Sequence, residues 1–236
     1  MMTLRKLGLA ILFGVGYVVA WIFVALPIYI ISKRRHARAF HPQGTLCRAQ
    51  VDSTELDLAG PAFVRLSGAS GDEDSATRTI VGMAIKFSGG QDLPLASFES
   101  FLHVKTATAN TDITDYLANT FASVSPWKLP DTGIVWFRAR RVLPAGTSSS
   151  TEATRTARLR DDITQQRATI ELEIRSRPNA DGPLIRKLAT ITLTEILPED
   201  PTFRISMFHT GRHLVPTGFR NGVRAAVYPV SQRGRG

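Results

Sequence analysis

The sequence predicts an α+β protein in which one long apolar helix precedes an antiparallel sheet, folded as a sandwich or a closed barrel. Short segments rich in β-branched and aromatic residues recur between turn-rich connections over residues 45–196, which is typical of such sheets. The first 36 residues contain a long uncharged apolar run. With 236 residues, 43% of them hydrophobic, the chain can form one domain of about 200 residues plus an appendage.

The appendage, residues 1–36, is predicted to be a single-pass membrane anchor. No residue between Lys6 and Lys33 is charged, and Leu7–Ser32 is long enough to cross a bilayer as a helix, which needs about 20 apolar residues. A cleaved signal peptide would have a shorter apolar region followed by small residues, whereas a basic cluster follows here. We expect a kink at Pro27.

The charge distribution argues for membrane contact and against nucleic-acid binding. Six of the 29 basic residues fall in the first 38 positions, where no acidic residue occurs, so 23 basic and 20 acidic residues remain for the domain. The basic residues after the apolar run place the C-terminal domain on the cytoplasmic side of the membrane. A single cysteine, Cys47, allows no internal disulfide and is expected to be a small buried hydrophobe.

The domain, residues 37–236, is predicted to be built mainly of strands. In one of them Ile170, Leu172 and Ile174 alternate with polar residues, as expected for a strand with one wet face. Helices are expected at Asp112–Phe121 and at Gly218–Tyr228, where Pro229 ends the second helix. The predicted strands are Thr45–Asp52, Ala62–Leu66, Ile80–Phe87, Phe101–Thr106, Gly133–Val142, Ala168–Ile174 and Ala189–Ile196.

The C-terminal segment carries the strongest chemical signal. Arg224 and Tyr228 are four residues apart and share one face of a helix. A guanidinium beside a phenol favours the phenolate, the form in which tyrosine ligates haem iron. Arg233 and Arg235 follow closely enough to bind anionic groups. A basic C-terminal helix with one tyrosine packed on the core is the alternative.

Four segments resemble the haem catalases, in that family's order. The tail, Arg-x-x-x-Tyr-Pro-x-Ser-x-Arg-x-Arg, resembles the proximal haem motif, and Arg38-Ala-Phe-His-Pro-Gln-Gly44 resembles the distal-histidine motif. Phe63–Gly68 is similar to the family's Val-Arg-Phe-Ser strand, and Asp74–Phe87 is similar to the segment that follows it. The resemblance extends from about His36 to the C-terminus with an unclear middle, and the short catalase-like members are closest in size.

This resemblance implies an antiparallel eight-stranded β-barrel of catalase type with flanking helices, and a haem b cofactor. His41 would be the distal acid and base, Ser67 would orient it, and Tyr228 would ligate the iron. The implied catalytic residues are His41, Ser67 and Ser97. The implied haem-binding residues are Arg38, Arg65, Arg78, Arg224, Tyr228 and Arg235.

The implied function is a membrane-anchored, haem-dependent enzyme that reduces or decomposes hydrogen peroxide or lipid hydroperoxides. The family's distal asparagine is absent and Ser97 is the nearest equivalent, which favours a peroxidase over a fast catalase. Only eight residues separate the apolar run from His41, so the distal side lies within roughly 30 Å of the membrane. A non-catalytic haem-binding or haem-sensing module and a barrel without haem remain as alternatives, and homo-oligomerisation is left open.

Other motifs are weaker. His209 and His213 have a zinc-compatible spacing, but no third ligand lies at a recognisable distance. The sequence contains neither a glycine-rich phosphate loop nor a Gly-x-Ser-x-Gly nucleophile elbow.

Overall fold

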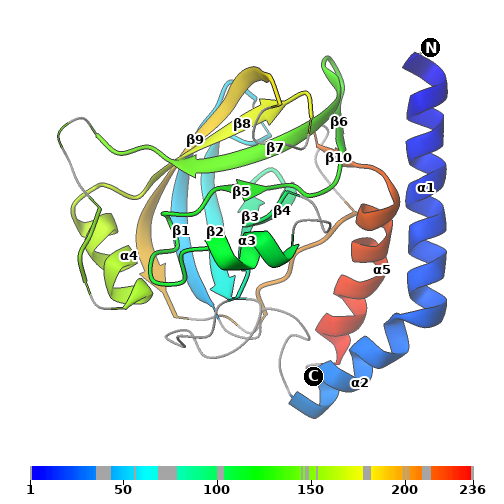
Figure 1. Ribbon diagram of the computed structural model, residues 1–236, viewed down its shortest axis with the longest axis horizontal. Coiled ribbons are helices and arrows are strands. Elements are labelled where there is room, and N and C mark those ends of the chain that lie inside the picture. Colours follow the sequence, from blue (N-terminus) through cyan, green and yellow to red (C-terminus); the bar gives the residue numbers. More distant parts are fainter. Residues whose placement is uncertain are drawn as a thin grey trace.

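A closed antiparallel barrel forms the body of the protein (Figure 1). The computed structural model describes residues 2–35, 44–55, 57–68, 79–99, 104–144, 146, 149–152, 154–177, 182–198, 200, 202–208 and 214–234. The eight barrel strands are β1 (Thr45–Asp52), β2 (Gly60–Gly68), β3 (Val81–Phe87), β4 (Asp92–Ala96), β5 (Phe121–Ala122), β7 (Gly133–Arg141), β8 (Thr169–Arg175) and β9 (Leu184–Leu197).

The sheet closes because its first and last barrel strands pair with each other. The barrel order is β7-β5-β4-β3-β2-β1-β9-β8, and β8 pairs back onto β7, for example through Ala139 and Leu172. Two short strands, β6 (Trp127–Leu129) and β10 (Val215–Pro216), extend the sheet beyond β7. The predicted eight-stranded antiparallel barrel is therefore confirmed.

The barrel interior is filled by side chains. Residues that alternate along the strands, such as Val64, Met83, Ile85 and Leu172, are almost completely buried in one apolar cluster. Cys47 belongs to this cluster, as expected for a small buried hydrophobe. A packed interior of this kind leaves the outside of the barrel as the place for a large planar ligand.

Six of the seven predicted strand segments overlap observed strands. The strand predicted at Phe101–Thr106 is wrong for Val104–Thr106, which belong to helix α3 (Val104–Asn110), and its first three residues lie outside the described part of the chain. The helix predicted at Asp112–Phe121 is also wrong. There the Asp112 carboxylate accepts hydrogen bonds from the amides of Thr114 and Asp115, which stabilises a turn instead of a helix.

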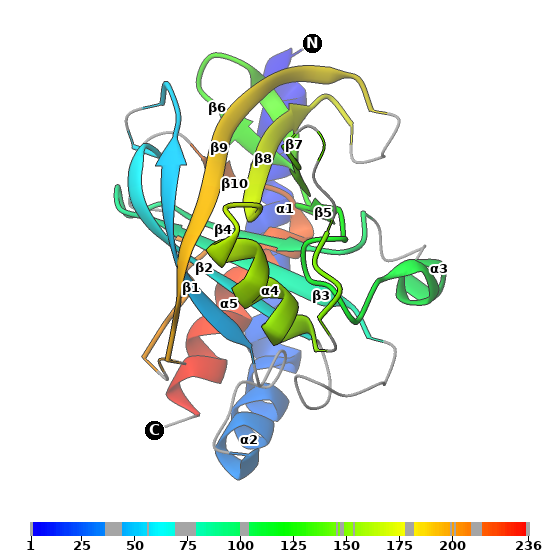
Figure 2. The same ribbon diagram turned by 90° about the vertical axis from the view of Figure 1, so that its left-hand side faces the viewer.

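Helix α4 (Arg155–Thr164) lies on the opposite side of the barrel from the terminal helices (Figures 1 and 2). The Thr154 hydroxyl caps it by accepting a hydrogen bond from the Ala157 amide at 3.2 Å. This helix was not predicted, because the sequence around it resembles a Ser/Thr-rich loop.

Helix α5 (Phe219–Arg233) begins where it was predicted but continues five residues past Tyr228. The expectation that Pro229 ends the helix is wrong. Proline removes one backbone hydrogen bond and strains the preceding turn, but packing against two other helices holds α5 together. The Ser231 hydroxyl, for example, lies 3.0 Å from that of Ser32 in a neighbouring helix.

The apolar N-terminal segment forms two helices, α1 (Met2–Phe23) and α2 (Ala25–Arg35), which pack along α5 (Figure 1). The break at Val24 lies three residues before Pro27, as expected for a proline kink. Within the described part of the chain, no single helix is both long and apolar enough to cross a membrane. The pair Leu7–Phe23 and Ala25–Arg34 passes that test only together, and it is bent by 56°.

Candidate functional site

The outward side of strands β2, β3 and β4 is buried, although it faces away from the barrel interior. Leu66, Met83 and Leu93 belong to the core cluster and therefore point into the barrel. Because side chains alternate between the two faces of a strand, the residues next to them point outward. We define the outer face as Arg65, Ser67, Gly82, Ala84, Pro94 and Ala96.

Strand register arranges the outer face in two rows. Arg65 pairs with Ala84, and Ala84 pairs with Pro94. In the next row Ser67 pairs with Gly82, which pairs with Ala96. Four of the six residues are glycine, alanine or proline, so the block across β3 and β4 is flat and about 10 Å wide, two strand spacings.

One polar edge of the outer face is packed closely against Gly44. Arg65 and Ser67 are each only 4% exposed. A Cβ atom on Gly44 would lie 2.7 Å from the Ser67 Cβ and 2.8 Å from the Arg65 guanidinium carbon, so only glycine fits. The structure thus brings the end of the predicted distal motif, Gly44, against Arg65 and Ser67. The predicted residues Arg38, His41, Arg78 and Arg235 lie outside the described part of the chain.

Helix α5 presents one stripe of side chains to the barrel. Asn221, Arg224, Tyr228 and Gln232 recur at intervals of three or four residues and therefore share a face. The Asn221 amide donates to the Pro126 carbonyl at 3.0 Å, and the Gln232 amide donates to the Ile205 carbonyl at 2.9 Å. The opposite side of α5 packs against α1 and α2.

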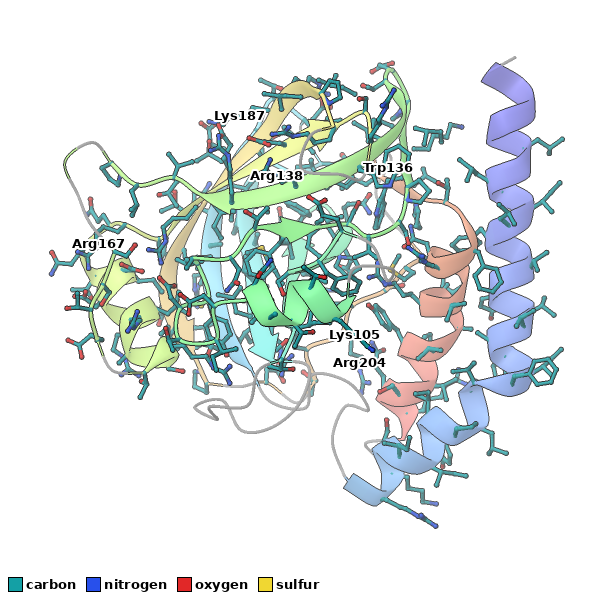
Figure 3. All side chains as sticks on the ribbon, viewed as in Figure 1. Lys105, Trp136, Arg138, Arg167, Lys187 and Arg204 are labelled. Carbon is teal, nitrogen blue, oxygen red and sulfur yellow. The ribbon has the colours of Figure 1, made fainter. Side chains whose placement is uncertain are left out.

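The contacts at the two ends of this stripe align α5 with strand β4. Arg224 donates to the Ser123 carbonyl at 3.3 Å, and Ser123 directly follows Ala122, which pairs with Ala96 at one end of β4. At the other end, Ile205 lies beside Ser206, whose amide donates to the Asp92 carboxylate at 2.7 Å. The chain on this side also includes Arg204 (Figure 3), whose carbonyl accepts from Lys86 at 3.2 Å.

Tyr228 lies midway along this alignment. It is one helical turn, about 6 Å, from both Arg224 and Gln232. Its ring is half-buried and packs against the core cluster. The helical repeat therefore places the Tyr228 side chain on the side of α5 that faces the barrel, between the contacts that flank the two ends of β4.

Arg224 and Tyr228 share a helix face as predicted. The hydrogen bonds of the Arg224 guanidinium go to Ser123 and, at 3.5 Å, to the Asn221 side chain. Among the described residues, no hydrogen bond joins Arg224 to Tyr228.

Ser97 holds three elements together at the end of β4. Its hydroxyl accepts a hydrogen bond from the Val81 amide at 3.0 Å and lies 3.0 Å from the Thr111 hydroxyl. Ser97 thus joins β4 to the start of β3 and to the residue after α3. Both of these hydrogen bonds of the Ser97 hydroxyl are structural, because they join elements of the fold.

Asp92 is a polar group on this side of β4 that the sequence interpretation did not assign. Burial raises the pKa of its carboxyl, while the hydrogen bond from Ser206 and the charge of Lys86 oppose that rise. The signal in the sequence was one carboxylate at the start of a run that is otherwise apolar, Asp92–Ala96.

A cleft of about 280 Å³ adjoins the outer face beyond the Arg65 row. Two residues along β2 from Arg65, Phe63 pairs with Lys86 of β3, and both side chains line this cleft. Lys86 and Arg204 contribute two cations to its lining. The remaining lining residues are Leu46, Asp200, Thr202 and Phe203.

The residues present are of the kinds that would hold a haem. A flat macrocycle needs a wall without large side chains, and Gly82, Ala84, Pro94 and Ala96 form such a wall beside Arg65. Its carboxylates need cations, and Arg65 is a buried arginine at the edge of that wall. Tyr228 is a phenol on the facing helix. Across the described ranges, no cluster of three or more His, Cys, Asp or Glu residues could hold a bare metal ion.

Comparison with solved structures identifies the architecture. A fungal catalase superposes with a TM-score of 0.60 and 17% identity over 84% of this chain, and a bacterial catalase superposes with 0.59 and 14% over 88%. The chain has a catalase-like fold. It spans about 60% of the length of these two catalases (59% and 60%). No protein-family model and no curated protein sequence matches the chain.

Proposed function

We propose that the protein is a haem-dependent enzyme of catalase type, attached to a membrane by its N-terminal segment, that reduces or decomposes hydrogen peroxide or organic hydroperoxides. One observation carries the proposal. A buried arginine and serine, packed on Gly44, edge a flat face of small residues in a catalase-like barrel, and the helix that carries Tyr228 is hydrogen-bonded to Ser123 and Ile205, in segments that flank the two ends of β4.

Each of these residues has a role toward a bound haem. The Tyr228 oxygen would hold the iron, and Arg224, one helical turn away on the same face, would pair with that iron-bound oxygen. Arg65 would pair with a haem carboxylate, together with Arg38 and Arg235. Bound haem would supply the electrons that cleave the peroxide bond.

Proton transfer would be the task of His41. A neutral imidazole there accepts the proton from the peroxide and returns it to the departing oxygen, which is general acid–base catalysis. Ser67 would orient this imidazole by a hydrogen bond. His41 is three Cα–Cα steps from Gly44, a reach of at most about 11 Å, which is compatible with such a hydrogen bond.

Absorption spectroscopy tests the cofactor assignment. The protein, produced with ample haem, is expected to show a ferric tyrosinate-haem spectrum, and Tyr228→Phe is expected to lose the haem. Tyr29→Phe, on α2, is the matched control and should keep it. A colourless wild-type protein, or a Tyr228→Phe variant with an unchanged spectrum, would contradict the proposal.

A haem-binding module without peroxide turnover is the second candidate. It is favoured by Ser97, the nearest equivalent to the family's distal asparagine, because the Ser97 hydroxyl is occupied by Val81 and Thr111. The two candidates are separated by His41→Ala. If wild type turns over peroxide and His41→Ala does not, with haem retained in both, the protein is an enzyme.

A further inference from the structure

One side of helices α1 and α2 is a continuous apolar surface that no part of the described chain covers. Phe23, for example, is 72% exposed, and Trp21 donates a hydrogen bond only to Tyr17 on the same helix, at 3.0 Å. We define the apolar stripe as Leu7, Ile11, Leu12, Val15, Val18, Val19, Trp21, Ile22, Phe23, Leu26, Ile30 and Ile31.

The other side of α1 is packed against the domain along most of its length. The Gly218 amide donates to the Leu9 carbonyl at 3.0 Å. A Cβ on Gly16 would collide with the backbone of Phe219, and a Cβ on Gly222 would collide with that of Phe13. Two helices whose glycines meet backbone in this way are in close contact, as small residues at helix interfaces permit.

This packing conflicts with a helix that crosses the bilayer alone. The hydrocarbon core is about 30 Å thick, so it would cover the whole 22-residue α1, which is about 33 Å long. The domain beside α1 would then lie at the same depth. Lys128, which lines a surface cleft together with Ala10 and Phe13 of α1, would then enter the hydrocarbon, and a charge at that depth is costly.

Cations border the apolar stripe at its α2 end. Lys33 and Arg34 are exposed, and Arg233 is exposed at the end of α5. These ends are adjacent, because a Cβ on Gly234 would lie 2.8 Å from the Ser32 side chain and 3.2 Å from the Lys33 amide nitrogen. An apolar helix side bordered by cations matches a membrane surface that contains anionic lipids.

We propose that the apolar stripe lies in the plane of an anionic membrane surface, immersed by about 5–10 Å, with the barrel and both chain termini on the same side of the bilayer. The inference rests on the membrane attachment proposed above and not on haem. In this arrangement α1 and α2 lie on the membrane surface and do not cross the bilayer. The outer face of the barrel is then held at a fixed distance from the lipid.

Depth-dependent fluorescence quenching tests this arrangement. In a full-length Cys47→Ala background, single cysteines replace Leu7, Val15, Ile22 and Ile30, and each carries an environment-sensitive fluorophore. The proteins are bound to vesicles of phosphatidylcholine and phosphatidylglycerol that contain lipids brominated at known depths. We expect all four positions to report the same shallow depth. Arg160→Cys, on α4, should show no quenching.

A crossing helix gives a different profile, with Val15 near the bilayer centre and Leu7 and Ile30 near opposite surfaces. That result would overturn the in-plane arrangement and leave membrane attachment intact. Failure of the protein to float with vesicles, together with a stable dimer in solution, would overturn both and assign the stripe to a second copy. The haem spectrum is measured separately, so neither result decides the cofactor.

The cations provide a second measurement. Lys33→Gln with Arg34→Gln should lower partitioning into the anionic vesicles by roughly 30-fold and leave binding to pure phosphatidylcholine unchanged. Equal partitioning of the wild type and the double variant into anionic vesicles would show that the charged border plays no part, contrary to the proposal.

Discussion

Replacing Gly222 by alanine should destabilise the packing of α1 on α5. A Cβ on Gly222 would lie 2.8 Å from the Tyr17 amide nitrogen and still closer to the Phe13 carbonyl oxygen. Both atoms belong to the backbone of α1, so neither can rotate out of the way. The two helices must separate, and α5 must move relative to the barrel.

The magnitude follows from two opposing effects. Alanine favours the helix over glycine by about 1 kcal/mol. Forcing extra volume into a close-packed contact costs typically 1–3 kcal/mol, and contact with rigid backbone puts this site at or above the upper end. We therefore expect a net loss of about 2 kcal/mol or more, equivalent to a fall in melting temperature of at least about 4–8 °C for a protein of this size.

The assay is thermal unfolding of the full-length protein in mild detergent, followed by circular dichroism. Gly14→Ala is the matched control, since Gly14 lies on α1 and a Cβ added there would have no neighbouring atom within 4 Å. It should be as stable as wild type, or more stable by up to about 1 kcal/mol. The reasoning is refuted if Gly222→Ala melts at or above the wild-type temperature, or if the two variants shift equally.

Three further predictions concern the site, the pH dependence and the substrate. Gly44→Ala should weaken haem binding at least several-fold in a haem titration, because its Cβ would displace Ser67 and the Arg65 guanidinium; Gly14→Ala should not. Burial disfavours the charge of Glu173, but hydrogen bonds from Arg175 and Arg140 outweigh it and lower the pKa of Glu173 below 4.5. The ionised carboxylate therefore stabilises the fold above pH 4.5, and this stability is lost as the pH falls through the lowered pKa. Urea unfolding should show Glu173→Gln to be less stable by about 1–3 kcal/mol at pH 7 and to lose less stability than wild type on acidification. If the substrate comes from the membrane, the haem-loaded protein in nanodiscs should turn over fatty-acid hydroperoxides; turnover of hydrogen peroxide alone would contradict this.

The strands were predictable where their residues alternate. Apolar and polar residues alternate in Ala189–Ile196, which lies within β9, and in Ala168–Ile174, which overlaps β8, although Glu173 on the polar side of β8 is buried. Strand β4 was not predicted, because Asp92–Ala96 is buried on both faces and contains Pro94. Pro94 is tolerated since β4 pairs fully with β3 but meets β5 only at Ala96.

The errors in the helix predictions have a different cause. Apolar residues four apart suggested a helix at Asp112–Phe121, but side-chain hydrogen bonds within the segment stabilise turns there. Pro229 was expected to end a helix by its intrinsic preference, which tertiary packing overrides. Local propensity carries no information about which helix lies alongside.

Motif order named candidate site residues, but it did not predict how they are arranged. Short motifs identified Arg65, Ser67, Arg224 and Tyr228 as candidates. That Arg65 and Ser67 share a flat face with residues of β3 and β4 depends on strand register, which is a long-range property. Sequence spacing contains no information on the small residues opposite Tyr228.

Helix α5 links the two surfaces on which these proposals depend. Tyr228 and Arg224 lie on the side that faces the barrel, whereas Gly222, Ala226 and Val227 lie on the side that packs against α1 and α2. A helix moves as a rigid body, so a force on α1 at the lipid surface shifts the phenol relative to the outer face. Because an iron ligand must be held to within a fraction of an ångström, membrane attachment and occupancy of the haem site are expected to depend on each other.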